Sequence, residues 1–201
     1  MFDRSVSQRI APAIHRLARQ ASRLGLTANQ LTLLGFLFGL FAAFLIAFEA
    51  YLAGAVAILA SRLLDALDGA VARLTNATDA GGFLDIALDF VFYASIPLAF
   101  AVSDPARNAL PAAVLLAAFI GTGSSFLAFA VMAAKRGLSN LATPNKSFYF
   151  MGGLTEASET LLCFMAMCLW PGLFIELAYG FAALCAITTA TRIWWGWKAF
   201  Q

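Results

Sequence analysis

Charged residues are scarce in this sequence, and their scarcity excludes a water-soluble protein. Lys, Arg, Asp and Glu make up 12% of the 201 residues, whereas 62% are hydrophobic. Soluble domains typically contain about 25% charged and about 45–50% apolar residues. A small domain cannot hide so much apolar surface from water, because its surface is large relative to its volume. The composition therefore predicts an integral membrane protein that forms one domain over residues 1–201.

Histidine and cysteine are also rare. The single histidine, His15, lies in the N-terminal segment, where we interpret it as structural. The three cysteines lie within apolar runs and match neither a metal-binding nor a CxxC spacing; they are Cys163, Cys168 and Cys185. We interpret them as buried packing residues. The net charge of +2 is too small to indicate nucleic acid as a partner.

The sequence contains long apolar runs that are interrupted by few charged residues. Six of them have close to the roughly 20 residues that cross a bilayer as a helix. We place them at about 30–49, 52–74, 82–103, 109–134, 147–170 and 173–197. The breaks between the runs are short, so successive helices should be antiparallel neighbours in one bundle over residues 30–197. The predicted fold class is an all-α membrane protein with six transmembrane helices.

An amphipathic segment precedes these runs. Apolar residues recur at helical spacing over residues 3–24, and Arg9, Arg16 and Arg23 form a separate basic stripe. This pattern is typical of an interfacial helix that lies on a membrane surface with its arginines near anionic lipid headgroups. The alternative is a helix that packs on the cytoplasmic face of the protein itself. No cleavable signal peptide is visible, because the first continuous apolar run begins only near Leu31.

The basic residues are distributed unequally between the two predicted sides of the membrane. If the chain starts inside, the inner side holds nearly all of the Lys and Arg residues outside the apolar runs, and the outer side holds only Arg107. This asymmetry agrees with the positive-inside rule. We therefore expect both termini to be cytoplasmic.

Four aspartates at the junction of the second and third runs form the most informative pattern. Asp65 and Asp68 are three residues apart, and Asp85 and Asp89 are four apart, so each pair projects from one face of its helix. The short loop between the helices should bring the two pairs together near the cytoplasmic end. An ionisable residue at the centre of a membrane helix costs about 2.5–3.5 kcal/mol, so four convergent acids need compensating charge.

The positive charge that these four carboxylates need is most naturally supplied by divalent cations. Carboxylate oxygens without a nearby His or Cys suit Mg²⁺ or Mn²⁺ better than Zn²⁺, and they also admit Ca²⁺. Ion pairs with Arg62 and Arg73 are the structural alternative, but two cations cannot neutralise four carboxylates. Gly69 and Gly81 let a ligand approach the backbone, and Arg73 can bind phosphate oxygens bidentately. Two metals bridging a phosphate would stabilise the attacking and leaving oxygens of an in-line displacement.

The same residues resemble the signature of a known family. The stretch from Asp65 to Asp89 is similar to that of the CDP-alcohol phosphatidyltransferases, D-x2-D-G-x2-A-R followed by seven or eight residues and G-x3-D-x3-D. Every fixed position is present, with seven residues between Arg73 and Gly81. The six predicted spans and the N-terminal amphipathic segment also match the family. Within it, the sequence is most similar to a small bacterial inner-membrane subgroup.

This resemblance implies an enzyme that transfers a phosphatidyl group from CDP-diacylglycerol to the hydroxyl of a small alcohol and releases CMP. It implies that the four aspartates bind two Mg²⁺ ions, with Mn²⁺ as a substitute, and that Asp89 is also the general base. The residues that it implies for the cytidine and diphosphate are Asn29, Gly69, Arg73 and Gly81. It further implies a homodimer in the bacterial inner membrane, with the active site facing the cytoplasm.

The acceptor alcohol is less well defined. Candidate acceptor-binding residues are Lys135, Arg136, Lys146, Glu156 and Glu159. We expect the two glutamates to lie two to three turns inside the fifth span, where unpaired acids are rare. Because a carboxylate repels phosphate, they favour an unphosphorylated acceptor, a polyol such as inositol or an amino alcohol. The three basic residues favour the alternative, glycerol 3-phosphate.

A cation transporter lined by the same four aspartates is the alternative from another class of protein. The acids cluster near one face of the predicted bundle and do not continue across it, and Arg73 suits a phosphate better than a cation. Both observations favour the enzyme. Arg62 lies one turn before Asp65, and we expect it to be either a partner of the acids or a substrate contact.

Overall fold

The computed structural model describes residues 2–137 and 153–201, and every regular element within these ranges is a helix. The elements are α1 (Phe2–Arg23), α2 (Ala28–Ala47), α3 (Tyr51–Leu74), α4 (Asp79–Ser103), α5 (Pro105–Lys135), α7 (Ala157–Leu169), the short 3₁₀ helix η1 (Pro171–Leu173) and α8 (Phe174–Phe200). The predicted all-α class is confirmed for these residues.

Side-chain caps explain where three of the helices begin. Gln30 N donates a hydrogen bond to Thr27 Oγ1 at the start of α2, and Gly81 N donates one to Thr78 Oγ1 at the start of α4. Asp104 caps α5 in the same way. Such caps satisfy N–H groups that the first turn of a helix leaves without a partner. These helices therefore begin two to four residues before the apolar runs that predicted them.

Four helical segments among the described residues are long and apolar enough to cross a membrane. They are α2, α4, α5 and Pro171–Phe200, which comprises η1 and α8. The helix α3 has 24 residues but includes Arg62, Asp65 and Asp68, and α7 has only 13 residues. Crossing by α3 and α7, and hence the count of six spans, remains a prediction.

The segment before α7 differs from the predicted fifth helix, 147–170. Residues 147–152 lie outside the described residues, and residues 153–156 are not helical. Instead, Leu154 N and Thr155 Oγ1 each donate a hydrogen bond of 3.1 Å to Thr188 Oγ1 on α8. A Cβ at Gly153 would overlap the Thr188 side chain, so this close approach needs glycine. Residues 153–156 therefore contact α8 and do not extend α7 toward the N-terminus.

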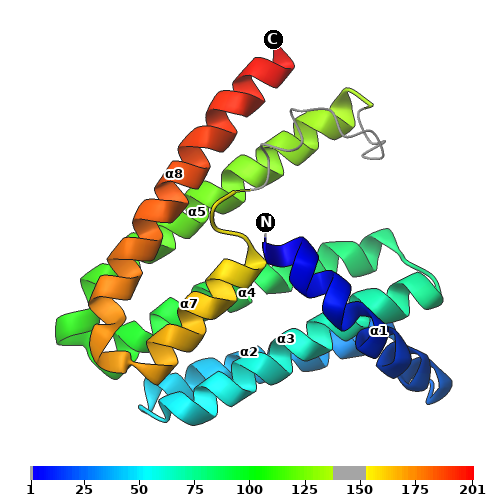
Figure 1. Ribbon diagram of the computed structural model, residues 1–201, viewed down its shortest axis with the longest axis horizontal. Helices are drawn as coiled ribbons and strands as arrows, with labels where there is room; N and C mark the ends of the chain where they lie inside the picture. Colours follow the sequence, from blue (N-terminus) through cyan, green and yellow to red (C-terminus); the bar gives the residue numbers. More distant parts are fainter. Residues whose placement is uncertain (1, 138–152) are drawn as a thin grey trace.

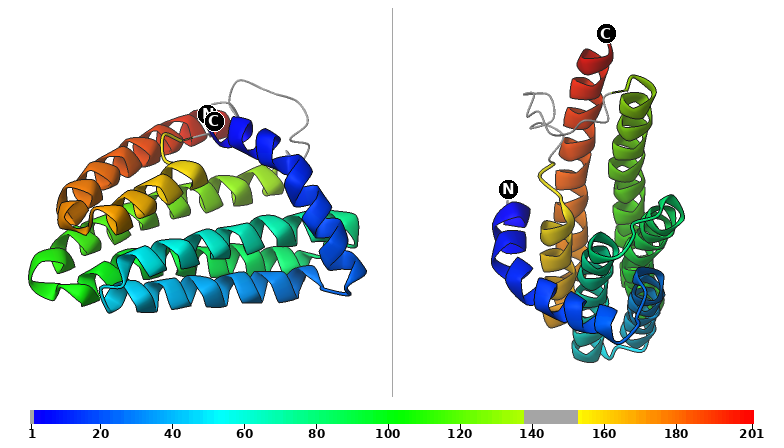
Figure 2. Two further views of the ribbon diagram at one scale, coloured as in Figure 1. Left: turned by 60° about the horizontal axis from the view of Figure 1, so that its bottom comes forward. Right: turned by 90° about the vertical axis from the view of Figure 1, so that its right-hand side faces the viewer.

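The helices form two groups that diverge at one end. In Figures 1 and 2, α2, α3 and α4 lie side by side, and each runs antiparallel to the one before it. The helices α5 and α8 pack along each other and extend away from this group. The helix α7 contacts α3, and its buried Phe164 belongs to a core that also includes Phe92, Phe100 and Phe174. The core thus joins the two groups at the end where they are close.

The N-terminal helix α1 packs on the protein. Ala18 is fully buried, and Ile14 and Ala21 pack with it against a small cluster that includes Ala70 and Val71 of α3. The alternative stated above also has this segment pack on the protein itself, but on its cytoplasmic face, and that side of the membrane remains a prediction. Leucine and arginine side chains elsewhere on α1 are exposed, namely Arg16, Leu17, Arg19 and Arg23, as is Leu24 directly after the helix. Contact of that exposed face with a lipid surface remains a prediction.

Candidate active site

Small residues bring α2, α3 and α4 close together beside the acidic residues. A Cβ at Gly35 would lie 3.2 Å from Leu64 Cβ, and one at Gly39 would lie 2.6 Å from the Phe92 ring. Ser61 Oγ donates a buried hydrogen bond of 2.7 Å to the carbonyl oxygen of Gly35. Because glycine has no side chain, it allows this close approach. The packing holds the acidic segments of α3 and α4 against α2.

Three of the four predicted metal ligands converge. One carboxylate oxygen from each of Asp65, Asp68 and Asp85 lies within 4.8 Å of the other two. Asp68 is 4% exposed, and its Oδ2 is buried without a hydrogen-bond partner. Burying such an oxygen without a partner is costly, and a divalent cation would provide one. The three carboxylates therefore fit a site for Mg²⁺ or Mn²⁺.

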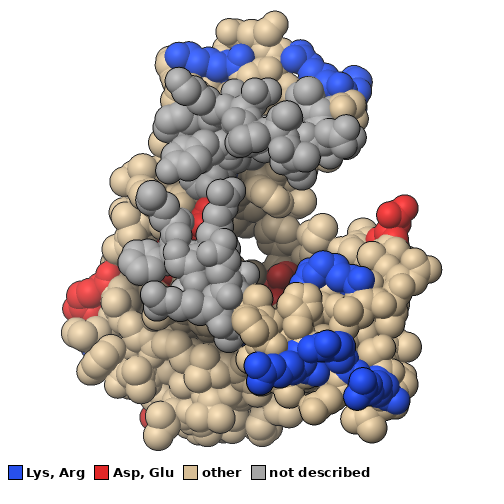
Figure 3. Space-filling model, turned by 45° about the vertical axis from the view of Figure 1, so that its right-hand side comes forward, with Lys and Arg blue, Asp and Glu red and all other residues tan. Residues whose placement is uncertain are grey.

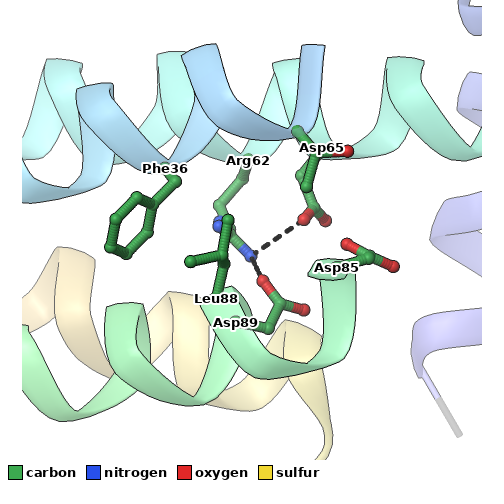
Figure 4. A pocket seen from close by; sticks show the side chains of 7 residues that line it. Phe36, Arg62, Asp65, Asp85, Leu88 and Asp89 are labelled. Carbon is green, nitrogen blue, oxygen red and sulfur yellow. Dashed lines mark hydrogen bonds and ion pairs between the residues drawn. The ribbon is translucent and has the colours of Figure 1, made fainter. Parts of the chain in front are cut away.

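The fourth acid, Asp89, forms an ion pair with Arg62. Arg62 Nη1 donates to Asp89 Oδ1 at 2.7 Å and lies 3.5 Å from Asp65 Oδ1 (Figure 4). The guanidinium also donates to Ser61 Oγ at 3.3 Å, and its central carbon lies 4.0 Å from the centre of the Phe92 ring. Of the two roles expected for Arg62, the structure shows that of a partner of the acids. The ion pair joins α3 to α4.

Asp89 lies between two cavities. The smaller has about 10 Å³, enough for about one water-sized group, and is lined by Thr32, Phe36, Arg62, Asp65, Asp85, Leu88 and Asp89 (Figure 4). The larger has about 1120 Å³ and is lined mostly by apolar residues of α4 and α5, together with residues 155–157 and Thr160 at the start of α7 and Arg192 of α8. The structure describes all four motif aspartates, and of these four Asp89 alone lines both cavities.

The molecule is visibly hollowed between its two groups of helices. Figure 3 shows Lys and Arg side chains gathered on both sides of the hollow, and acidic side chains within it. Glu156 and Arg192 line the larger cavity together with Asp89. Arg192 Nη1 donates to the carbonyl oxygen of Thr122 at 3.1 Å, which holds the guanidinium against α5. The larger cavity therefore combines an apolar wall with charges of both signs.

Sequence reasoning missed Arg192. It lies on α8, far along the chain from the acidic motif, and only the packing of α8 against α5 brings it to the cavity that Asp89 lines. One signal was available in the sequence. Arg192 is the one basic residue within the predicted sixth span, 173–197, where a charge is costly unless it has a function or a partner.

Of the two glutamates predicted for the acceptor site, Glu156 lines the larger cavity and Glu159 does not. Glu156 is the N-cap of α7 and lines the larger cavity. Glu159 Oε2 accepts hydrogen bonds from Glu156 N at 3.1 Å and from Ser158 Oγ at 3.2 Å, so it caps the first turn of α7. The prediction that both lie two to three turns inside a helix is wrong, because α7 begins only at Ala157.

The basic residues predicted for the acceptor site lie elsewhere or outside the described residues. Lys135 and Arg136 are exposed at the end of α5 and line neither cavity. Arg136 donates to the carbonyl oxygen of Phe200, and its guanidinium lies 5.3 Å from the centre of the Phe200 ring. This contact joins the ends of α5 and α8. Lys146 lies outside the described residues.

The four residues predicted to bind the nucleotide form two pairs. A Cβ at Gly81 would lie 2.9 Å from Asn29 Oδ1, and a Cβ at Gly69 would lie 3.3 Å from Arg73 Nη1. The glycines thus let the Asn29 and Arg73 side chains lie against the helix backbone. Asn29 and Arg73 are exposed, whereas Asp68, next to Gly69, is buried. The pairs therefore present polar side chains to solvent beside the acidic residues.

Comparison with known proteins gives a consistent result. The profile of the CDP-alcohol phosphatidyltransferase family matches residues 25–194. Inner membrane protein YnjF of Escherichia coli is 52% identical over 201 residues, which cover 100% of this chain and 98% of YnjF. The archaetidylinositol phosphate synthase of Pyrococcus horikoshii is 33% identical over 103 residues, 51% of this chain and 55% of that enzyme.

Solved structures of a phosphatidylinositol phosphate synthase from Mycobacterium tuberculosis share this fold. The form with CDP-DAG bound has a TM-score of 0.66 and 23% identity, and the match covers 92% of this chain and 93% of that one. The form with manganese and citrate has a TM-score of 0.67 and 23% identity, covering 92% and 88%. With the profile match and the full-length similarity to YnjF, these findings establish that the chain belongs to the CDP-alcohol phosphatidyltransferase family and is a phosphotransferase.

Proposed function

We propose that this enzyme transfers a phosphatidyl group from CDP-diacylglycerol to the hydroxyl of a small alcohol and releases CMP. The position of Asp89 between the acidic cluster and the larger cavity is the main support. A donor diphosphate bound at the acidic cluster would place its phosphorus next to an acceptor in that cavity. The solved relative that holds CDP-DAG supports the same donor here.

In the proposed reaction, the residues of this chain bind the donor and move one proton. Asn29, Gly69, Arg73 and Gly81 bind the cytidine and the diphosphate. Asp89 takes the proton of the acceptor hydroxyl as that oxygen bonds to the phosphorus of the phosphatidyl group, and the bond from this phosphorus to the CMP oxygen breaks. Two Mg²⁺ ions, or Mn²⁺, held by the four aspartates would stabilise the charge on the attacking and leaving oxygens.

We infer that the acceptor is unphosphorylated, a polyol such as inositol or an amino alcohol. Glu156 supports this inference, because it lines the larger cavity and a carboxylate accepts hydrogen bonds from hydroxyls or pairs with an amine. The second candidate is a phosphorylated acceptor such as glycerol 3-phosphate. Arg192 favours it, because a guanidinium in the same cavity can bind a phosphate.

We place the enzyme in the bacterial inner membrane, with its active site and both termini on the cytoplasmic side. YnjF is an inner membrane protein, and the basic ends of α3, α5 and α8 agree with a cytoplasmic site. A homodimer remains part of the proposal. So does contact of α1 with the lipid surface.

The test is CMP release from CDP-diacylglycerol by the purified full-length protein in detergent. Inositol, serine, choline, ethanolamine and glycerol 3-phosphate are supplied in turn with Mg²⁺. We expect one unphosphorylated acceptor to support release, excess chelator to abolish it, and Mg²⁺ or Mn²⁺ to restore it. Use of glycerol 3-phosphate alone contradicts the acceptor assignment, and full activity in chelator after dialysis contradicts the metal requirement. Cation flux into liposomes without any CMP release favours the transporter alternative.

A further inference from the structure

Arg62 is a cation enclosed among the acids proposed to bind metal. Its side chain is 13% exposed, and it contacts Asp89 and Asp65 on one side and the Phe92 ring on another. Ser61 Oγ accepts a further hydrogen bond from the same guanidinium. These contacts come from both α3 and α4, so they hold the guanidinium in one place.

The ion pair separates Asp89 from the other three acids. Asp65, Asp68 and Asp85 have oxygens close enough to share one ion, and Asp89 does not belong to that group. Its Oδ1 instead accepts the 2.7 Å hydrogen bond from Arg62. A metal ion and a guanidinium repel each other, and both need the same negative oxygens. A second ion bound by Asp89 would therefore compete with Arg62.

We propose that Arg62 is a positioning residue that holds Asp89 in the metal-free enzyme and competes with a divalent cation for it. The proposal rests on the function above, in which Asp89 is both a metal ligand and the base. Without metal, the ion pair offsets the repulsion among the four acids and keeps α3 and α4 together. It also fixes the carboxylate at the junction of the two cavities, where the acceptor hydroxyl has to be deprotonated.

The first test is Mn²⁺ binding to the metal-stripped protein in detergent, measured by electron paramagnetic resonance of the free ion. The variants are wild type, Arg62→Gln and Arg19→Gln, the last of which removes an exposed charge of α1 that lines neither cavity. We expect Arg62→Gln to bind its weaker Mn²⁺ ion about tenfold more tightly, because the Asp89 carboxylate is then no longer paired with a guanidinium. Arg19→Gln should bind Mn²⁺ as wild type does. Unchanged or weaker binding by folded Arg62→Gln overturns the proposal.

The second test uses variants that keep the site folded. Arg62→Lys retains the charge and should keep the wild-type Mn²⁺ affinity, so a tenfold increase in that variant contradicts competition by charge. In an Asp89→Asn background, Arg62→Gln should change Mn²⁺ affinity much less than in wild type, because the contested carboxylate is gone. An equal change in both backgrounds overturns competition at Asp89.

Thermal unfolding provides a third readout that needs no substrate. In chelator, Arg62→Gln should unfold at a lower temperature than wild type, and Mg²⁺ should restore most of the difference. A variant as stable as wild type in chelator contradicts the structural half of the proposal. Because these measurements use neither CDP-diacylglycerol nor acceptor, a wild-type protein that releases no CMP would contradict the proposed reaction and leave the test of Arg62 intact.

Discussion

At the scale of single residues, Asp89 differs from the other motif acids in its surroundings and not in its chemistry. It follows Asp85 by one helical turn, so the two carboxylates share a face of α4. That one turn places Asp89 beside the larger cavity and within reach of Arg62. A general base has to lie within hydrogen-bond reach of the hydroxyl that it deprotonates. Asp89 lines the larger cavity, in which we propose that the acceptor binds.

Substitution of Asp89 tests its role as the base. Asp89→Asn should lower the rate of CMP release by about 10²–10⁴-fold, because an amide of nearly the same shape cannot take the proton. The matched control is Asp79→Asn, an exposed acid in the first turn of the same helix that lines neither cavity. It should keep activity near that of wild type. Near-normal release by folded Asp89→Asn would exclude this role.

The two glutamates at the start of α7 allow a matched test of the acceptor site. Glu156→Gln should raise the KM for the acceptor by about tenfold, since it weakens a charge-assisted hydrogen bond to the substrate. Glu159→Gln should leave that KM unchanged, because Glu159 caps α7 and Gln can accept the same hydrogen bonds. Both constants come from CMP release measured against acceptor concentration. Equal KM values for the two variants would remove Glu156 from the acceptor site.

At the scale of helices, close contacts decide where the functional side chains lie. A Cβ at Gly39 of α2 would lie 2.6 Å from the Phe92 ring and 3.2 Å from Ser61 Oγ. Phe92 and Ser61 are also the residues that support the Arg62 guanidinium. The residues at the close contact of α2 with α3 and α4 therefore also hold Arg62 in its ion pair with Asp89.

A pair of glycine substitutions tests this connection. Gly39→Ala would place a Cβ 2.6 Å from Phe92 Cδ2, so we expect it to lower the stability in detergent by about 1–3 kcal/mol through overpacking. The control is Gly180→Ala on α8, where nothing lies within 4 Å of the added carbon. Alanine favours a helix more than glycine does, so this control should be neutral or slightly stabilising. Equal unfolding temperatures for the two variants would show that the contact at Gly39 is not tight.

At the scale of the whole molecule, the divergence of α5 and α8 from α2, α3 and α4 creates the larger cavity (Figures 1 and 3). The same divergence leaves Lys135, Arg136 and Lys198 at the ends of α5 and α8 that lie away from α2, α3 and α4. Figure 3 shows Lys and Arg side chains on both sides of the hollow between the two groups of helices. An anionic donor would be attracted to such an opening.

Cysteine labelling tests the orientation of the molecule in the membrane. In a variant without the three native cysteines, Lys135→Cys should react only with a reagent on the cytoplasmic side, and Ala106→Cys only with one on the outer side. Both positions are exposed, whereas the nearby Asn108 is 8% exposed and bonded to the Phe100 carbonyl, so a cysteine there would be poorly accessible. The reverse pattern would invert the topology and place the acids on the side away from cytoplasmic CDP-diacylglycerol.

The sequence alone determined the features that depend on neighbours along the chain. The apolar runs gave the positions of the long helices, because the length and composition of a helix decide whether it can cross a bilayer. The spacing of Asp65, Asp68 and Asp85 predicted that they converge, because residues three or four apart share a helix face and a short loop joins α3 to α4. The family signature also follows from this local spacing.

The tertiary structure decided the features that depend on residues far apart in sequence. Arg62 and Asp89 lie on different helices, and only the packing of α2, α3 and α4 determined that they form an ion pair. Likewise, contact of residues 153–156 with α8 made α7 begin only at Ala157. The packing of α8 against α5 brought Arg192 to the larger cavity that Asp89 lines. Periodicity along one helix shows which face a side chain occupies, but the partner of that face is set by how the helices pack.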